Sequence, residues 1–176
     1  MIPYLRDNLL RGLKVSPFKA PLKSLIPVPI YVCASLAIGF YTELFSVDIV
    51  DYPMSLVLPF TLFVFPSLLE EALFRGILIP NDAANHSRTS VVLCISLSTF
   101  AFVMWHPLNA LTINKAAMIF FLNPVFLLIT ALLGITCSIS YVISRSLWMP
   151  IIIHWFTVIA WVMFLGGRNK ILELWS

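Results

Sequence analysis

Charged side chains are scarce in this sequence. They make up 11% of its 176 residues, whereas hydrophobic residues make up 60% and the mean hydropathy is +0.97. Soluble globular domains usually carry about 25% charged residues. So little polar surface excludes a water-soluble monomer and indicates a protein whose solvent is the lipid bilayer.

Cysteine is also scarce, and its spacing argues against cysteine-based sites. Cys33, Cys94 and Cys137 lie far apart in apolar runs, without a CxxC pair. We therefore interpret them as small buried hydrophobic side chains rather than as disulfide or metal partners. The net charge of +3 is too small to indicate nucleic acid as a partner.

A basic N-terminal stretch precedes a series of long apolar segments. Residues 1–24 carry five basic residues and one acidic residue, with Leu5, Leu9 and Leu13 at four-residue spacing. This pattern fits an amphipathic helix on an anionic membrane surface, and it fits a plain cytoplasmic tail equally well. The apolar segments that follow cover residues 25–46, 53–80, 90–106, 119–143 and 147–166.

The lengths of these segments predict the fold. A spanning helix needs about 20 apolar residues, a length that four of the segments reach and the third approaches. We predict an all-α, polytopic bundle of about five spanning helices, with residues 25–176 forming one transmembrane bundle after the amphipathic segment. Pro107 directly follows the third segment and is expected to end its helix.

The distribution of Lys and Arg predicts that the N-terminus lies in the cytoplasm. With five crossings, the cytoplasmic side collects eight basic residues and the opposite side three. The cytoplasmic set is Arg6, Arg11, Lys14, Lys19, Lys23, Arg75, Arg88 and Arg145, and the opposite set is Lys115, Arg168 and Lys170.

Three charged residues interrupt the second apolar segment. Each of Glu70, Glu71 and Arg75 would cost about 2.5–3.5 kcal/mol near the centre of a spanning helix, so such residues normally face the bundle interior and mark function. Glu71 and Arg75 are four residues apart and are predicted to pair. Glu70 points about 100° away and is left unpaired, which suits a general base. The alternative is that all three are ordinary charges among the lipid headgroups.

Two histidines lie in similar apolar surroundings. His106 ends the third segment, one turn after Phe102, and His154 lies near the start of the fifth. Counted along the helices at 1.5 Å per residue, both histidines and Glu70 fall between the midplane and the same face of the membrane. We therefore expect the three side chains to converge, although a membrane histidine can also serve helix packing alone.

A carboxylate and two imidazoles in a dry cavity allow two chemistries. In one, Glu70 deprotonates a water that attacks a carbonyl, while the histidines orient the water or stabilise the oxyanion. In the other, the same residues bind a divalent zinc ion that activates the water. No HExxH motif is present, so no cofactor is expected and zinc is the alternative. The tryptophans, Trp105 among them, are interpreted as interface or packing residues.

These residues resemble the motifs of the CPBP family, which comprises type II CAAX proteases and bacteriocin-processing, Abi-like intramembrane proteins. The matches are Glu70, Glu71 and Arg75 to EExxxR, Phe102 and His106 to FxxxH, and His154 to the first position of a later HxxxN. The resemblance covers about residues 55–165. It implies a bundle of eight helices or fewer and an intramembrane endopeptidase acting on membrane-associated substrates.

By family analogy, the first glutamate activates water and the histidines support the water and the oxyanion. Eukaryotic members trim prenylated CAAX tails. Val158, however, stands where many members have the asparagine of HxxxN, and loss of an oxyanion donor costs about 3–4 kcal/mol of transition-state stabilisation. The alternative is therefore a catalytically weak scaffold or chaperone that partners another membrane protein. A proton transporter is disfavoured, since five helices without an inverted repeat would be unusual.

Overall fold

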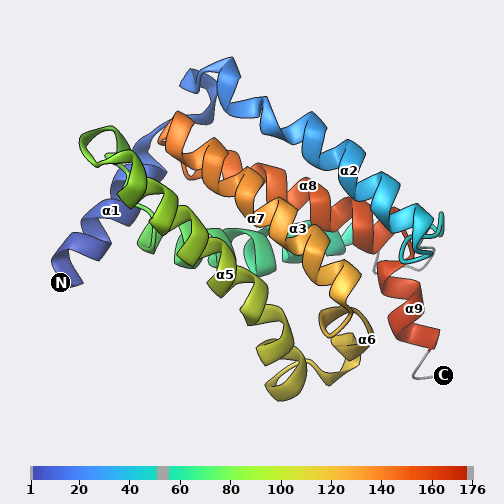
Figure 1. Cartoon of the computed structure of the whole chain (residues 1–176). Coiled ribbons are helices and arrows are strands. Elements are labelled where there is room, and N and C mark those ends of the chain that lie inside the picture. Colours follow the sequence, from blue (N-terminus) through green and yellow to red (C-terminus); the bar gives the residue numbers. More distant parts are fainter. Residues whose placement is uncertain (1, 51–55, 174–176) are drawn as a thin grey trace.

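The computed structural model describes residues 2–50 and 56–173, and these form a bundle of helices (Figure 1). Among them the only β pairing is an isolated bridge between Asp48 and Leu165. The predicted all-α class is confirmed. The main helices are α1 (Ile2–Lys14), α2 (Pro27–Tyr41), α3 (Leu58–Leu62), α5 (Arg88–Thr112), α6 (Met118–Phe121), α7 (Pro124–Ser144), α8 (Trp148–Phe164) and α9 (Gly167–Glu173).

Three helical stretches are long and apolar enough to cross a membrane. They are Leu22–Tyr41, which joins the short 3-10 helix η2 (Leu22–Leu25) to α2, together with α5 and α7. Helix α8 is equally apolar but has 17 residues. Four of the five apolar segments thus each contain one long helix, whereas the segment at 53–80 does not.

The segment that carries the two glutamates is a broken helix. It runs from α3 through the π-helical η4 (Phe63–Leu68), the short α4 (Leu69–Glu71) and the π-helical η5 (Ala72–Ile77). Phe65 has an extended backbone, with φ −133° and ψ 121°. Pro66 explains this break, because proline restricts the preceding residue to extended conformations and lacks a backbone N–H. Wide π turns of this kind are frequent at functional sites.

Helix α5 continues through Pro107, so the predicted end of the third segment is wrong. The helix reaches Thr112, which places His106 six residues before its last residue. Proline removes one backbone hydrogen bond from a helix, but helices surrounded by other helices tolerate this loss. The start of α5 is set by Ser87, whose Oγ accepts a hydrogen bond from the backbone N–H of Ser90.

Helix α1 packs against the bundle. Its Leu9 and Leu13 contact a buried cluster made of Ile79, Tyr141, Leu147 and Ile151. The buried Asn8 side chain donates to the carbonyls of Gly76 and Ile79 at 2.8 and 2.9 Å, and accepts from the N–H of Asn81 at 2.7 Å. The apolar face that the leucine spacing predicts is therefore present, but protein covers it.

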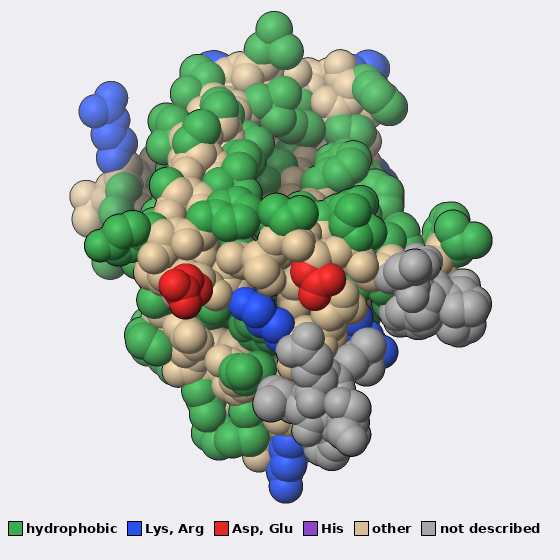
Figure 2. Space-filling model, turned by 90° about the vertical axis from the view of Figure 1, so that its right-hand side faces the viewer, with side chains coloured by type: hydrophobic (Ala, Val, Ile, Leu, Met, Phe, Trp, Pro, Cys, Tyr) green, Lys and Arg blue, Asp and Glu red, His purple; other side chains and the backbone are tan. Residues whose placement is uncertain are grey.

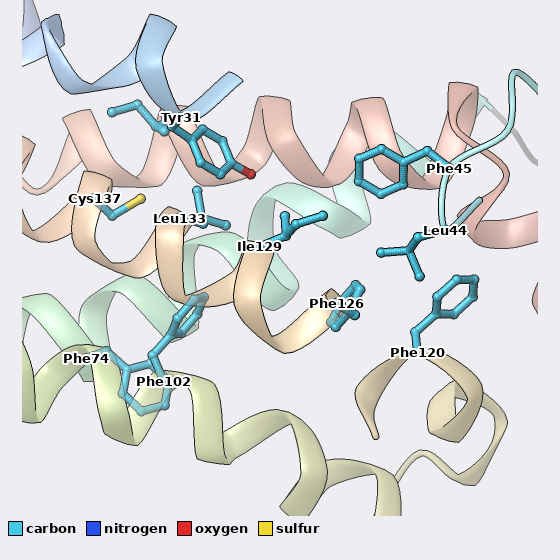
Figure 3. Packing of buried hydrophobic residues seen from close by; sticks show 11 residues of the cluster. Tyr31, Leu44, Phe45, Phe74, Phe102, Phe120, Phe126, Ile129, Leu133 and Cys137 are labelled. Carbon is cyan, nitrogen blue, oxygen red and sulfur yellow. The ribbon is translucent and has the colours of Figure 1, made fainter. Parts of the chain in front are cut away.

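A second and larger buried cluster lies between α2, α5, α6 and α7 (Figure 3). It is rich in aromatic rings, with Phe102, Phe120 and Phe126 among its members. Cys137 is fully buried there, as expected. Cys33 is exposed on α2, so the expectation of burial is wrong for that residue. A thiol is apolar enough to face lipid.

The two ends of the bundle carry most of its charges. At the end shown in Figure 2, acidic and basic side chains gather near the middle of the face, with hydrophobic side chains around them. There Lys170 of α9 donates to the carbonyls of Glu43 and Leu44, both at 3.1 Å. Arg75 belongs to neither end, because it is fully buried. Without Arg75, the predicted division of Lys and Arg residues becomes seven on the cytoplasmic side and three on the opposite side.

Candidate active site

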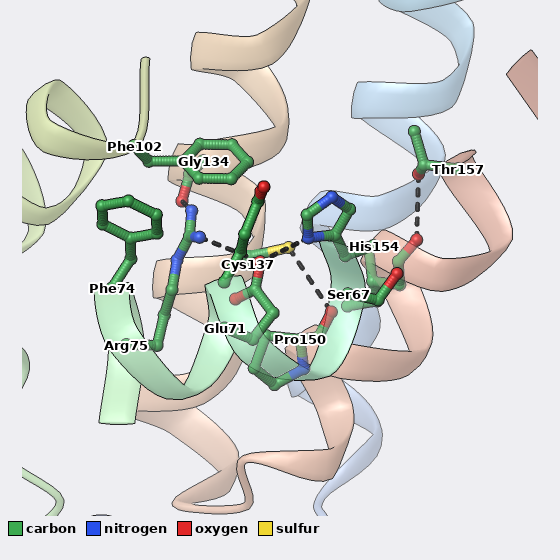
Figure 4. Close-up of polar contacts among 12 residues, drawn as sticks. Ser67, Glu71, Phe74, Arg75, Phe102, Gly134, Cys137, Pro150, His154 and Thr157 are labelled. Atoms are coloured by element: carbon green, nitrogen blue, oxygen red, sulfur yellow. Dashed lines mark hydrogen bonds and ion pairs between the residues drawn. The ribbon is translucent and has the colours of Figure 1, made fainter. Parts of the chain in front are cut away.

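A buried ion pair lies at the centre of the bundle (Figure 4). Nη1 of Arg75 lies 2.9 Å from Oε1 of Glu71, and both side chains are fully buried. This is the pair that the four-residue spacing predicts. The same oxygen of Glu71 accepts a second hydrogen bond, from Nδ1 of His154 at 2.9 Å. Glu71 therefore ties its own segment to α8 as well as holding Arg75.

The other nitrogens of Arg75 bond to α7. Nη2 donates to the carbonyl of Gly134 at 3.0 Å, and Nε lies 3.4 Å from Oγ of Ser138. A buried guanidinium is tolerated only when its donors are satisfied, and here three of its nitrogens have partners. Glycine allows this approach, since a Cβ at position 134 would lie 3.3 Å from Nη2 and 3.0 Å from the Thr99 side chain.

Phe102 lies between the cation and both imidazoles. Cζ of Arg75 lies 4.3 Å from the centroid of the Phe102 ring, a cation–π contact. The ring centroids of His106 and His154 lie 5.2 and 5.5 Å away, both edge-to-face. The fully buried Phe102 thus sets the positions of both histidine rings, which gives the FxxxH spacing a physical role.

The partners of the two histidines assign their tautomers. Nδ1 of His106 lies 2.9 Å from the carbonyl oxygen of Phe102, and Nδ1 of His154 lies 2.9 Å from the Glu71 carboxylate. Both partners can only accept, so each Nδ1 carries a hydrogen, and in the neutral form of each ring Nε2 presents a lone pair. Neither Nε2 has a hydrogen-bond partner within the described residues. A neutral imidazole at either position can therefore accept a hydrogen bond.

Glu70 is separate from this ion pair. It is 7% exposed, and within residues 2–50 and 56–173 it forms no salt bridge. Its Oε1 accepts a hydrogen bond from Nε1 of Trp105 at 3.0 Å, whereas its buried Oε2 has no partner among the same residues. The expectation that Glu70 lacks a charged partner holds in the structure, but the expectation of a wholly free side chain is wrong.

Glu70, His106 and His154 line one cavity of about 360 Å³, so the predicted convergence is present. Phe102 and Trp105 also contribute to its wall, whereas Glu71 and Arg75 do not. The two adjacent glutamates therefore differ in access. Glu70 can touch a bound molecule, and Glu71 contacts only the protein.

The cavity reaches the apolar outer surface of the bundle. Val32 and Leu36 of α2 line it on one side and Phe65 of η4 lines it on the other. These side chains are also 42%, 38% and 52% exposed at the surface. Residues of α2 and η4 that line the cavity are thus also part of the exposed apolar surface of the bundle.

The described residues offer no preformed set of ligands for zinc, the alternative that the sequence leaves open. No group of three His, Cys, Asp or Glu side chains in the described part of the chain is placed to hold a metal ion. The carboxylate that bonds a histidine directly is Glu71, and its oxygen is shared with Arg75. The arrangement is that of an ion pair with a hydrogen-bonded imidazole.

A family model described as type II CAAX prenyl endopeptidase Rce1-like matches residues 52–160, more than half of the chain. The chain belongs to the Rce1-like family. This confirms the resemblance to CPBP proteins, and with the long apolar helices it makes the chain a CAAX-protease-like integral membrane protein. The match includes all six candidate residues between Glu70 and His154. No curated protein and no solved structure matches the chain significantly.

Two residues of this Rce1-like site were not assigned a site role from the sequence. The sequence predicts Trp105 to be an interface or packing residue, but its indole N–H donates to Oε1 of Glu70. Asn109 lines the cavity and is 5% exposed. Helical spacing could have identified Asn109 from the sequence, because it lies three residues after His106 on the same helix face. For Trp105, the signal is that a buried indole needs an acceptor.

We expect the Glu71–Arg75 pair to be strongly coupled in stability. Glu71→Gln or Arg75→Met alone should lower the free energy of unfolding by about 3–5 kcal/mol, because each leaves an uncompensated buried charge. The double variant should lose less than the sum of the two. Unfolding in detergent micelles measures all three.

The exposed pair of Arg6 and Asp7 is the matched control, since Arg6→Ala should leave stability almost unchanged. Losses that simply add in the Glu71→Gln/Arg75→Met variant would contradict the coupling.

Proposed function

We propose that this protein is an intramembrane endopeptidase in which Glu70 activates the attacking water. The observation that carries the proposal is that the two adjacent glutamates have different contacts. Glu71 is held by Arg75 and His154, whereas Glu70 lines the cavity and its Oε2 has no hydrogen-bond partner among the described residues. A carboxylate that is buried, accessible to a bound molecule and free of a basic partner suits a general base.

The proposed reaction begins with a water in the cavity. The lone pairs on Nε2 of His106 and His154 accept hydrogen bonds from it and orient its oxygen, while Glu70 takes its proton. The water oxygen bonds to the substrate carbonyl carbon, and the carbonyl electron pair moves onto its oxygen. Collapse restores the carbonyl and breaks the C–N bond, and Glu70 returns the proton to the leaving amine.

The geometry limits what the histidines contribute. Stabilising an oxyanion requires a donor, but both Nδ1 hydrogens are committed to protein acceptors. Arg75 already neutralises Glu71, so a neutral His154 keeps this buried cluster uncharged overall. We therefore assign the histidines to positioning water.

We propose a membrane-associated, apolar substrate that enters between α2 and η4. The walls of the cavity are mostly apolar, and the gap faces the lipid-covered side of the bundle. Its volume of about 360 Å³ is within the range of sites that bind small apolar groups. A prenylated peptide with a CAAX tail, the substrate class in the family's description, has both an apolar group and a scissile peptide bond.

Glu70→Gln should abolish cleavage of a quenched, farnesylated CAAX reporter peptide by the purified protein. His106→Ala should lower kcat by about 10²–10⁴-fold, because the water is no longer oriented. Asn85→Ala, at the exposed end of the short 3-10 helix η6 (Ala83–Asn85) before α5, is the control that should remain fully active.

Full cleavage by Glu70→Gln would refute the proposed base. Stoichiometric zinc in the purified protein that disappears in Glu70→Gln would replace the metal-free chemistry with the zinc alternative.

The lateral route predicts a steric effect at the cavity mouth. Leu36→Trp should raise KM for the farnesylated reporter several-fold and change kcat little, because it narrows access without touching Glu70. Leu97→Trp is the matched control, since Leu97 is 59% exposed on α5 and does not line the cavity. Equal KM values for the two variants would place the entrance elsewhere.

We also propose that the N-terminus lies in the cytoplasm, which the seven-to-three division of basic residues supports. Helix α1 and Arg145 lie at the same end, because Trp148 bonds the carbonyl of Leu13. A cysteine placed at Lys14 should be shielded from an impermeant thiol reagent in intact cells, and one placed at Lys115 should react. The opposite pattern would reverse the topology.

A second candidate function is a scaffold for another membrane protein. The observation that favours it is Val158, which lines the cavity and brings no hydrogen-bond donor to the position four residues after His154. In cells, a phenotype kept in full by both Glu70→Gln and His106→Ala would support the scaffold over the peptidase.

A further inference from the structure

We propose that Asn109 is the catalytic oxyanion donor of this site, in place of the asparagine that Val158 replaces. The inference rests on the proposed peptidase function. In this role, Nδ2 of the Asn109 side chain donates a hydrogen bond to the substrate oxygen when that oxygen becomes negatively charged.

The position of Asn109 places it beside the water-positioning histidine. Phe102, His106 and Asn109 are four and three residues apart on α5, so they share one face of the helix. Side chains three residues apart on a helix are immediate neighbours, with Cβ atoms about 5–6 Å apart. All three side chains line the cavity that contains Glu70. Asn109 thus faces the space in which the scissile carbonyl would lie.

The side chain of Asn109 lacks the partners that a buried amide requires. It is 5% exposed, and its Oδ1 is buried without a hydrogen-bond partner among the residues that the structure describes. Its Nδ2 donates to none of those residues either. Leaving a buried amide unpaired costs free energy, so such groups are rare in native proteins. The developing oxyanion of a substrate would give Nδ2 the acceptor that it lacks, which explains why an amide stands here.

Two other polar groups of the cavity, both on α8, are less suitable donors. Thr157, adjacent to Val158, already donates its hydroxyl to the carbonyl of Ile153 at 2.9 Å. Nε1 of Trp161 has no partner within the described residues, but its ring packs between Phe120 and Phe126, with both ring centroids 5.1 Å away. Trp161 therefore lies with the aromatic cluster, seven residues from His154 along α8.

The role of Asn109 fits the reaction without an additional reactant. When the water oxygen bonds to the carbonyl carbon, the former π electrons become a lone pair on the substrate oxygen. Nδ2 of Asn109 keeps its hydrogens and only donates a hydrogen bond to this oxyanion. When the carbonyl re-forms and the C–N bond breaks, the hydrogen bond weakens again. Stabilisation is thus greatest in the transition state, as catalysis requires.

The test measures kcat and KM for the quenched, farnesylated CAAX reporter. Asn109→Ala should lower kcat about 10²–10³-fold with little change in KM, because the lost interaction exists only in the transition state. Asn109→Asp should be no better than Asn109→Ala, since a carboxylate cannot donate. Thr112→Ala, three residues further along α5 and exposed, is the control that should keep wild-type activity.

Rescue distinguishes a donor from a merely structural residue. Adding Val158→Asn to Asn109→Ala should restore kcat at least about tenfold, because it returns an amide donor to the usual position of the family motif. A kcat for Asn109→Ala within about twofold of wild type would overturn the inference. The inference would also be overturned if Trp161→Phe, which removes only the indole donor, lowered kcat and Asn109→Ala did not.

A stability measurement gives a readout that is independent of turnover. Asn109→Leu should raise the Tm of the substrate-free protein in micelles, because it replaces an unpaired buried amide by an apolar side chain. A lower Tm would show that Asn109 is held by structural contacts and would overturn its role. A wild-type kcat in Asn109→Ala together with no activity in Glu70→Gln refutes this inference alone, whereas full activity in Glu70→Gln refutes the proposed function as well.

Discussion

The ion pair between Glu71 and Arg75 is the interaction on which the rest of this structure depends. Two full charges inside an apolar bundle are tolerable only if they neutralise each other and if their remaining donors and acceptors are satisfied. The groups that meet these requirements are the carbonyl of Gly134 on α7, the His154 side chain on α8 and the Phe102 ring on α5. One neutralised pair therefore fixes how three long helices are placed around the glutamate segment.

The same arrangement explains why two adjacent glutamates have different roles. Glu71 turns toward α7 and α8, and Glu70, about 100° further around the same short helical turn, lines the cavity. The π-helical segments before and after this turn, together with the break at Phe65, let the chain present both carboxylates inside the bundle. Glu71 orients His154 through Nδ1, and Glu70 remains available to a bound molecule. Structure and proposed chemistry are thus divided between neighbouring residues.

The histidine tautomers determine which groups the proposed reaction still needs. Once both Nδ1 hydrogens are bonded to protein acceptors, neither imidazole has a donor for a developing oxyanion. Val158 brings none, and the hydroxyl of Thr157 is bonded within its own helix. In the proposed mechanism, the amide of Asn109, which has no partner among the described residues, completes the set of base, water-positioning groups and oxyanion donor inside one apolar cavity. Under this proposal, the oxyanion donor of the family motif is kept, but it comes from a different position in the chain.

The sequence by itself determined the bilayer environment, the all-α class and the family. It also determined the Glu71–Arg75 pair and the Phe102–His106 contact, because both are four-residue spacings within a single helix. Only the tertiary structure decided that His154 bonds Glu71, that Trp105 bonds Glu70 and that Asn109 faces the cavity. It also decided that α1 packs on protein and that α5 continues through Pro107. Contacts between helices depend on how the helices rotate and cross. Helical periodicity describes one helix at a time, so these contacts could not be derived from spacing.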